Sequence, residues 1–360
     1  MTQRAIVYCE GQFGTTDGKT ANGLVRSSAL YEIVAVIDST KAGWDAGEYL
    51  DQRKSGIPIV RNLEEALSLR PEKPEYFILG IAPAHAFLTE KERNVIIEAM
   101  KRGMNIINPL HEFLTDDAEM MDWASKCGVH IRDIRKPKPK KEWHIFTGRI
   151  LKIKTPVVAV LGTDGAVGKR TTAVILYHAL REKGLHPAFI ATGQTGLIQG
   201  AKYGFAVDAF PMQFLIGELE NEVVRAYEEE KPDLIIVEGQ GALSHPAYAS
   251  SAGIIRGTRP QAVILQHPPK RKVLCDFPFY PMPDVEEEIS LIEHYGNTKV
   301  IALTLNHENM TDAEIEQTVT EYEKQYQLPV ADCIKMGPEK IVHAILNFFP
   351  SLKEKVEVSL

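Results

Sequence analysis

A glycine-rich segment in the second half of the sequence has the residue types that bind a phosphate group. It follows an apolar run at residues 157–161 and reads Gly162-Thr163-Asp164-Gly165-Ala166-Val167-Gly168-Lys169. Glycines let backbone N–H groups turn toward an anion, the N-terminus of a following helix adds partial positive charge, and a lysine adds a full one. The spacing therefore predicts a phosphate-binding loop between a buried strand and a helix over residues 171–183.

Two departures from the usual loop bear on its ligand. Five residues separate Gly162 from Gly168, where four are usual, and Arg170 stands where Ser or Thr usually holds Mg²⁺. Thr171 or Thr172 would have to supply that hydroxyl. Mg²⁺ binding and ATP hydrolysis therefore stay open. Phosphate binding is predicted for Gly162, Thr163, Asp164, Gly165, Ala166, Val167, Gly168, Lys169, Arg170, Thr171 and Thr172.

Four further segments are rich in Gly, Gln, His and Arg and are expected at the ends of strands. They cover residues 191–200, 237–248, 254–260 and 265–271. In a parallel α/β sheet the carboxyl ends of the strands face the ligand crevice. We therefore expect these segments to lie at the same edge as the phosphate loop.

The elements that would position these residues alternate between strands and helices along the chain, which is typical of parallel α/β folds. The pattern predicts a Rossmann-like parallel-sheet N-terminal domain over residues 1–135. It predicts a P-loop NTPase-like three-layer α/β domain over residues 156–360. Between them, residues 136–155 are interpreted as a basic linker or crossing segment, because Pro137 and Pro139 prevent a helix and the like charges repel one another.

The first domain carries a weaker ligand signal. A glycine-rich turn with Gly11 and Gly14 follows its first strand, and Asp38 ends the second, where dinucleotide-binding folds place an acidic residue on the ribose. The third glycine of that motif is misplaced. A wall of the ligand cleft or a dimer contact is therefore the favoured interpretation of this domain over NAD binding.

Composition narrows the class of protein. The 360 residues are 44% hydrophobic and 25% charged, with a net charge of −7 that argues against nucleic-acid binding. No apolar stretch approaches the roughly 20 residues that cross a bilayer, and the N-terminus reads as a strand and not as a signal peptide. The scattered cysteines suggest reduced, mostly buried thiols. We expect a cytoplasmic homo-oligomer with no membrane or nucleic-acid partner.

The phosphate loop resembles that of dethiobiotin synthetase, whose pattern is GTD-x-x-VGK-T; this sequence reads GTDGAVGK and then departs at Arg170. The segment LIIVEGQGALSHP is similar to the VEGAGG strand end of that family. The resemblance implies that Glu238 is a metal ligand, with Thr171 as a further one. Asn306, in VIALTLNHEN, would correspond to the asparagine that contacts the base, although a turn-capping role is equally compatible with it.

The combination of GTDGAVGKRTT and EGQGALSHPAY is identified with a two-domain family of formerly unknown function, often labelled epimerase/dehydratase-like. The resemblance spans nearly the whole chain. Some members of that family are D-glutamate N-acetyltransferases that use acetyl-CoA and act beside an enolase-superfamily partner. The resemblance implies the same activity here, with the loop holding the coenzyme phosphates.

Acetyl transfer to an amine needs a base for the ammonium proton and donors for the oxyanion. Glu238, His245 and His267 are the candidate catalytic residues, and both histidines precede a proline that stiffens the turn. A dicarboxylate substrate would need guanidinium groups, for which Arg256 and Arg259 are the candidates, with Gln194 as a polar contact.

Three functions follow as alternatives. The first is the acetyl-CoA-dependent N-acetyltransferase. The second is an ATP- and Mg²⁺-dependent ligase or kinase of the dethiobiotin-synthetase type, against which Arg170 weighs. The third is a regulatory protein that binds a nucleotide without turnover, against which the polar strand-end loops weigh.

Overall fold

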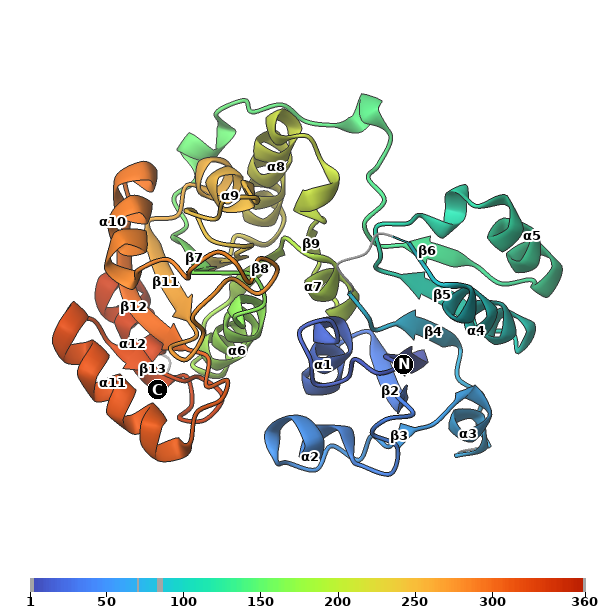
Figure 1. The fold of residues 1–360 in the computed structure, drawn as a ribbon. Coiled ribbons are helices and arrows are strands. Elements are labelled where there is room, and N and C mark those ends of the chain that lie inside the picture. Colours follow the sequence, from blue (N-terminus) through green and yellow to red (C-terminus); the bar gives the residue numbers. More distant parts are fainter. Residues whose placement is uncertain (1–2, 70, 83–86, 359–360) are drawn as a thin grey trace. The chain divides into compact units, whose positions relative to one another are not determined.

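The structure is a computed structural model that describes residues 3–69, 71–82 and 87–358. The chain divides into two compact units (Figure 1). The first contains Met1–Pro137 and Gln194–Ala201, and the second contains Lys138–Gly193 and Lys202–Leu360. Within the described ranges, none of the helices combines the length and apolar character needed to cross a bilayer.

The first unit is a Rossmann-like domain around a six-stranded parallel sheet with strand order β3-β2-β1-β4-β5-β6. Its strands are β1 (Gln3–Tyr8), β2 (Tyr31–Ile37), β3 (Ile59–Val60), β4 (Tyr76–Leu79), β5 (Asn105–Asn108) and β6 (Ile131–Asp133). Its helices are α1 (Lys19–Arg26), α2 (Ala46–Asp51), α3 (Leu63–Ser68), α4 (Glu90–Lys101), α5 (Ala118–Cys127) and α7 (Gln194–Gln199).

Asp38 at the end of β2 is fully engaged by its own unit. Its carboxylate accepts hydrogen bonds from the backbone N–H of Phe13 at 3.0 Å and from the Thr40 hydroxyl at 2.6 Å, and Lys41 lies 3.1 Å away. These hydrogen bonds hold the pKa of Asp38 below its usual value despite its burial. The carboxylate thus ties the glycine-rich turn to the sheet and does not face an open ribose site.

Helix α7 is a departure from the sequence-based expectation. Residues 191–200 were predicted as a strand-end loop beside the phosphate loop, but Gln194–Gln199 is a helix of the first unit. Gln199 donates from Nε2 to the carbonyls of Gly23 at 2.8 Å and Ser27 at 2.7 Å, and Ile198 is buried in that unit's core. The helix arises because residues 194–199 can bury an apolar side chain against α1, a tertiary effect that local composition does not reveal.

The second unit is built on a seven-stranded parallel sheet with strand order β13-β12-β11-β7-β10-β8-β9. Its strands are β7 (Val157–Gly162), β8 (Pro187–Ala191), β9 (Tyr203–Gly204), β10 (Leu234–Glu238), β11 (Ala262–His267), β12 (Lys299–Leu305) and β13 (Val330–Ala331). Its helices are α6 (Lys169–Glu182), α8 (Met212–Glu230), α9 (Ser250–Thr258), α10 (Val285–Gly296), α11 (Asp312–Tyr326), α12 (Glu339–Phe348) and α13 (Pro350–Val358).

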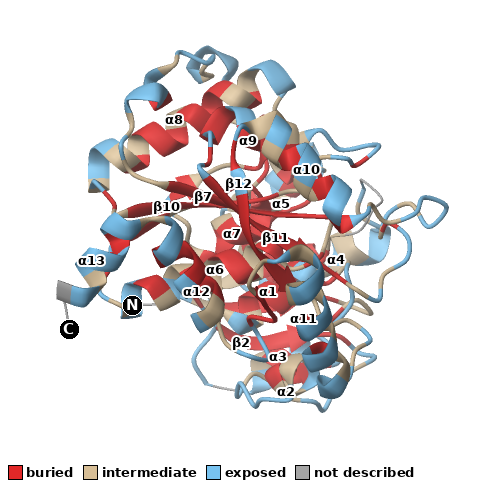
Figure 2. Cartoon of the chain, turned by 90° about the vertical axis from the view of Figure 1, so that its left-hand side faces the viewer, coloured by how far each residue is buried: buried red, intermediate tan, exposed pale blue. Residues whose placement is uncertain are grey.

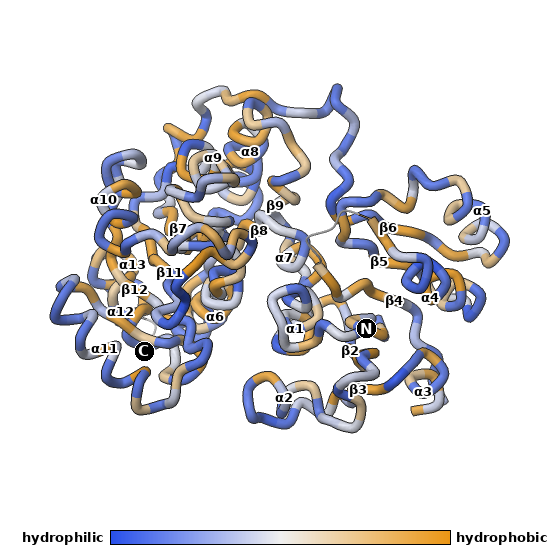
Figure 3. The backbone as a smooth tube through the Cα atoms, viewed as in Figure 1, coloured by the Kyte–Doolittle hydropathy of each residue, from blue (hydrophilic) through white to orange (hydrophobic). Residues whose placement is uncertain are grey.

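Successive side chains of β7 feed two separate cores, which makes this unit three-layered. Val157, Ala159 and Leu161 pack with residues of α8, α9, α10 and α11, whereas Val158 and Val160 pack with residues of α6 and α12. Figure 2 shows β7, β10, β11 and β12 buried, and Figure 3 shows hydrophobic residues concentrated along the strands. The continuous apolar runs of the sequence are therefore strands covered on both faces.

Residues 138–150, part of the predicted basic segment, pack on α8. Glu218 accepts from the backbone N–H of His144 at 2.6 Å and lies 2.9 Å from the Lys138 ammonium. Glu220 accepts from the backbone N–H groups of Thr147 at 2.6 Å and Ile150 at 3.2 Å. Buried carboxylates of one helix thus hold the backbone that leads into β7.

Candidate phosphate-binding site

The phosphate loop lies at the carboxyl end of β7, between the ends of β10 and β11. Its glycines are required by close contacts, because a Cβ at Gly162 would lie 2.9 Å from Cδ of Lys169 and 3.1 Å from the carbonyl oxygen of Gln266. Gly168 has a φ of 103° and caps α6 without a side-chain hydrogen bond. The first N–H groups of α6 are therefore presented at the mouth of the loop.

Lys169 begins α6 and turns back over the loop. Lys169 is only 5% exposed, and its ammonium donates to the backbone carbonyl of Asp164. The positive charge is thus held inside the turn of the loop, where it can contact a bound phosphate.

Asp164 anchors the first half of the loop, and its side chain is fully buried. It accepts from the Gly165 N–H at 2.6 Å, from Nη1 of Arg271 at 2.7 Å and from the Cys275 N–H at 2.8 Å. Arg271 also donates to the Gly165 carbonyl at 2.8 Å and forms a two-pronged pair with Glu308 at 2.6 and 2.8 Å. This guanidinium therefore fixes both the side chain and the backbone of the loop.

The last two residues of β11, Gln266 and His267, form hydrogen bonds at the base of the loop. The hydroxyls of Thr172 and Thr304 each donate to Oε1 of Gln266 at 2.6 Å. The Thr163 hydroxyl lies 2.9 Å from Nδ1 of the buried His267. Burial lowers the pKa of His267 from 6.5 to about 4, so the ring is neutral near pH 7. His267 is thus at the loop, but as a neutral hydrogen-bonding partner of Thr163.

Glu238 ends β10, directly beside β7, and is almost completely buried. Its Oε2 accepts from the backbone N–H groups of Thr192 at 2.9 Å and Gly193 at 3.3 Å. Burial raises its pKa, while the charges of Arg170 and Lys169 and these hydrogen bonds act in the opposite direction. A buried carboxylate with a raised pKa at the end of a strand is a candidate for proton transfer.

His245 lies in the loop after β10, and its side chain is fully buried. Its Nδ1 accepts from the backbone N–H groups of Ala247 and Tyr248, both at 3.2 Å, which assigns the proton of the neutral ring to Nε2. That Nε2 has no hydrogen-bond partner within the described residues and lies 3.8 Å from Oδ1 of Asp164. Burial lowers the pKa of His245. In this tautomer Nε2–H can donate a hydrogen bond on the side of the loop, and the predicted catalytic role of His245 stays a prediction.

Asn306, at the end of β12, contacts the second half of the loop. Its Nδ2 donates to the Val167 carbonyl at 2.9 Å, and its Oδ1 accepts from the Glu308 N–H at 3.0 Å. The side chain thus positions the loop and caps its own turn. Contact with a nucleotide base stays a prediction.

The arginines predicted for substrate binding are not at this edge. Residues 254–260 were expected to follow a strand. Instead they form the end of α9 and lead into the amino end of β11. The helix crosses back over the sheet, as parallel connections must, so its last residues reach the opposite edge. Arg256 stacks on Tyr295, with 4.2 Å from its Cζ to the ring centroid.

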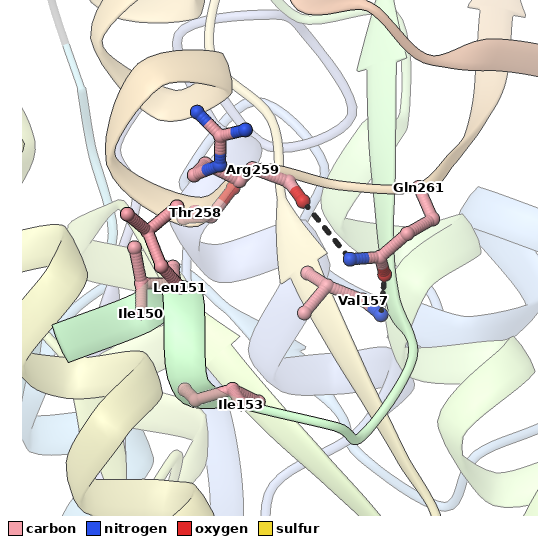
Figure 4. A pocket seen from close by; sticks show the side chains of 7 residues that line it. All are labelled: Ile150, Leu151, Ile153, Val157, Thr258, Arg259 and Gln261. Atoms are coloured by element: carbon pink, nitrogen blue, oxygen red, sulfur yellow. Dashed lines mark hydrogen bonds between the residues drawn. The ribbon is translucent and has the colours of Figure 1, made fainter. Parts of the chain in front are cut away.

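Arg259 lines a hollow of about 190 Å³ beside the amino end of β7 (Figure 4). Gln261 spans this edge by donating to the Arg259 carbonyl at 3.4 Å and accepting from the Val157 N–H at 2.6 Å. Neither arginine therefore faces the phosphate loop. Gln194 begins α7 in the first unit, and its predicted contact with the substrate stays a prediction.

The threonines that could hold a metal differ in whether their hydroxyl groups are already hydrogen-bonded. The Thr172 hydroxyl is engaged by Gln266, whereas Thr171 makes no side-chain hydrogen bond to another described residue. Within the described ranges, no group of three His, Cys, Asp or Glu side chains is arranged to bind a metal ion. Binding of Mg²⁺ by Thr171 and Glu238 stays a prediction.

Among the cysteines, Cys9 and Cys333 are buried and Cys127 and Cys275 are partly buried, and all four are free thiols. Cys275 is the one beside the phosphate loop, and burial raises its pKa to about 12. A thiol this weakly acidic is protonated at neutral pH, so Cys275 contributes its backbone N–H to the site and not a nucleophile.

A Rossmann-like unit followed by a unit with this phosphate loop defines a two-domain α/β protein of the P-loop class. Residues 144–342 match the P-loop domain of a family described as a domain of unknown function, DUF1611, and residues 39–137 match its Rossmann-like N-terminal domain. The chain belongs to the DUF1611 family.

Two relatives are each named D-glutamate N-acetyltransferase. The protein from a Pseudoalteromonas species is 30% identical over 273 residues, which are 74% of this chain and 80% of the relative. The protein from Tritonibacter scottomollicae is 27% identical over 274 residues, with the same coverage. A crystal structure of a DUF1611 family protein from Anabaena variabilis is similar, with a TM-score of 0.87, 28% identity, and coverage of 96% of this chain and 100% of that one.

Proposed function

We propose that the protein is an N-acetyltransferase that transfers the acetyl group of acetyl-CoA to the amine of D-glutamate or a similar amino acid. The observation that carries the proposal is the match to two relatives named D-glutamate N-acetyltransferase over 80% of their length. The phosphate loop supplies the second support, because coenzyme A contains a diphosphate that backbone N–H groups and a lysine can bind.

Arg170 is easier to reconcile with a coenzyme than with phosphoryl transfer. In ATP-dependent P-loop enzymes the residue after the lysine is a Ser or Thr that holds Mg²⁺. Here Arg170 follows Lys169, and its charge acts on Glu238. If the diphosphate only anchors the coenzyme and no phosphoryl group is transferred, a cation at this position can bind the diphosphate without a metal.

In the proposed reaction, the substrate amine attacks the thioester carbonyl carbon, a C–N bond forms and the C–S bond breaks. The ammonium group of the amino acid must first lose a proton. Glu238 is the proposed base, because burial raises its pKa and its strand end lies beside the phosphate loop. The departing thiolate takes up a proton, so that the products are the N-acetylated amino acid and free coenzyme A.

His245 is assigned a different role from Glu238. Its Nδ1 is occupied by two backbone N–H groups, so the neutral ring offers a proton at Nε2 and has no free lone pair for a base. A neutral imidazole that donates a hydrogen bond can stabilise a developing negative charge. We assign His245 as a donor on the loop side of the reacting group.

An ATP- and Mg²⁺-dependent ligase or kinase is the second candidate. It is favoured by the GTD-x-x-VGK loop and by Thr171, whose hydroxyl is not engaged by another described side chain. A regulatory protein that binds a nucleotide without turnover is the third. The first breaks the C–S bond of a thioester, the second breaks a phosphoanhydride bond of ATP, and the third breaks no bond.

The experiment compares two reactions of the purified protein. One contains acetyl-CoA with D-glutamate, L-glutamate or no amino acid, and free thiol is followed; the other contains Mg-ATP with the same acids, and phosphate is followed. Thiol release that requires D-glutamate is expected. Phosphate release without thiol release would overturn the proposal in favour of the ligase or kinase, and silence in both would favour the regulatory protein. A Lys169→Ala variant shows whether the activity uses the loop, and Lys299→Ala, exposed at the start of β12, is the matched control.

A further inference from the structure

The chain that follows β11 forms a short antiparallel turn, residues 272–282, which we call the strap. Val273 bridges to Pro281, the Leu274 N–H donates to the Tyr280 carbonyl at 3.0 Å, and the Met282 N–H donates to the Lys272 carbonyl at 3.0 Å. The tip of the strap carries Phe279, which is 81% exposed. Most of this ring is therefore open to solvent and can contact a ligand or another molecule.

The strap is attached to the first half of the phosphate loop. The Cys275 N–H donates to Oδ2 of Asp164 at 2.8 Å, and a Cβ at Gly165 would lie 3.2 Å from the Cys275 sulfur. Arg271, just before the strap, holds the same carboxylate. The strap therefore stands beside residues 164–165 of the loop, at a position fixed by buried hydrogen bonds.

Four rings form a continuous surface on the strap and the loop after β10, which we call the aromatic wall. His245 stacks on Tyr248 with 4.3 Å between centroids, and Phe277 lies 5.7 Å from His245 and 5.9 Å from Phe279. The Tyr248 hydroxyl donates to Asp276 at 3.0 Å, which joins the two segments. Tyr248 is 40% exposed. The wall is thus buried at its His245 end and open at its Phe279 end.

The second half of the phosphate loop borders a polar region instead. Asn306 holds the Val167 carbonyl, and a Cβ at Gly168 would lie 3.8 Å from its Nδ2. The next residue, His307, bonds through Nδ1 to the buried Asp332 at 2.7 Å. The loop therefore has an aromatic wall at one half and an amide and a histidine at the other.

We propose that the aromatic wall binds the uncharged pantetheine arm of coenzyme A, with the diphosphate in the loop and the adenosine end toward Asn306. The inference rests on the proposed function, since it assumes that the coenzyme is the ligand. Coenzyme A has a polar base on one side of its diphosphate and a flexible, largely apolar arm on the other. The two halves of the loop offer surfaces that match these two ends.

Charge also favours an uncharged group at the wall. The Asp164 and Asp276 carboxylates border this half of the loop, and Arg271, which neutralises Asp164, is shared with Glu308. The terminal phosphate of a nucleoside triphosphate placed here would be repelled by these carboxylates. An amide-containing arm carries no charge and can lie against aromatic rings.

The test measures binding, which keeps it separate from turnover. Isothermal titration gives the dissociation constants of coenzyme A and of adenosine 3′-phosphate 5′-diphosphate, which has the same phosphates but lacks the arm. Phe279→Ala should weaken coenzyme A binding about tenfold and leave the affinity for the truncated probe within about twofold. Phe279→Tyr, which keeps the ring, should bind both as the unaltered protein does, and Phe348→Ala on α12 is the control for loss of an exposed ring.

Three outcomes would overturn the inference. Equal weakening for both probes would place the nucleoside on the wall. No weakening for either would show that the wall does not contact the coenzyme. A change of oligomeric state in Phe279→Ala, seen by light scattering with coenzyme affinity unchanged, would identify the wall as a contact between two copies of this chain. If coenzyme binding depends on Phe279 but no acetyl transfer occurs, the proposed function fails and the wall stands. If acetyl transfer occurs and coenzyme A affinity does not depend on Phe279, the proposed function stands and the inference about the aromatic wall fails.

Discussion

Nη1 of Arg271 lies 2.7 Å from Oδ2 of Asp164, across 107 positions of the sequence. The Asp164 side chain is fully buried and that of Arg271 is 9% exposed, so this ion pair is shielded from water. The same guanidinium donates to the Gly165 carbonyl and to Glu308. The shape of the phosphate loop therefore depends on a residue that lies outside the loop.

We expect Arg271→Ala to destabilise the P-loop unit by about 3–5 kcal/mol, since it leaves a buried carboxylate without its partner. Urea unfolding can be followed by fluorescence of Trp143, which belongs to this unit, after Trp44 and Trp123 are replaced by Phe. Lys270→Ala is the neighbouring control, because Lys270 pairs with Glu314 at the surface and should contribute less than about 1 kcal/mol. A loss below about 1 kcal/mol for Arg271→Ala would show that Asp164 does not need this pair.

Lys169→Ala should weaken binding of coenzyme A or ATP by on the order of 1.5–3 kcal/mol, the range for a hydrogen bond to a charged group. The reason is that the Lys169 ammonium is held over the loop, where it can form a charge-assisted hydrogen bond with a bound phosphate. Lys169→Arg keeps the charge and should restore part of the affinity. Titration calorimetry measures both variants. An affinity unchanged by Lys169→Ala would mean that the ligand does not use this loop.

The sequence was sufficient to predict the fold class and the phosphate loop because both depend on local patterns. The buried strand expected at residues 157–161 and the helix expected over residues 171–183 correspond to β7 and α6. In α11 the start is fixed by Thr311 and Glu314, which form a capping box that short-range spacing encodes. The loop was predictable for the same reason, since its glycines and lysine are consecutive in the chain.

The residues that complete the site could not be found in this way. Arg271 ended a segment that had been noticed for its composition, but its contact with Asp164 depends on the return of the chain after β11. Helix α9 was missed, and with it the fact that Arg256 and Arg259 lead toward the amino edge of the sheet. The tautomer of His245 depends on two backbone N–H groups that no spacing rule specifies. Contacts over long sequence distances decide these features.

The low pKa of His267 predicts a dependence of stability on pH. In the folded protein its pKa is about 4, against an ordinary value of 6.5, so between these values the unfolded chain binds a proton that the folded protein does not. Stability should therefore fall as pH falls from 6.5 to 4, and this ring should contribute up to about 1.4 kcal/mol per pH unit. His267→Asn should reduce the slope of unfolding free energy against pH, whereas His343→Asn, exposed on α12, should not. Equal slopes in all three proteins would contradict a buried neutral His267.

Glu238→Gln tests the assignment of the base and the direction of its pKa shift together. Gln has nearly the same shape and can still accept from the Thr192 N–H, but it cannot take a proton, so kcat for acetyl transfer should fall by about 10²–10⁴. In the unaltered enzyme, kcat should rise with pH through a pKa above the ordinary value of Glu, because burial raises that pKa and only the ionised carboxylate accepts a proton. Glu222→Gln is the matched control, since Glu222 on α8 is also buried with a raised pKa but accepts from the Gly204 N–H of β9. If Glu238→Gln kept kcat within about threefold and kept the same pH profile, the proton would have to leave by another group, because a glutamine cannot titrate.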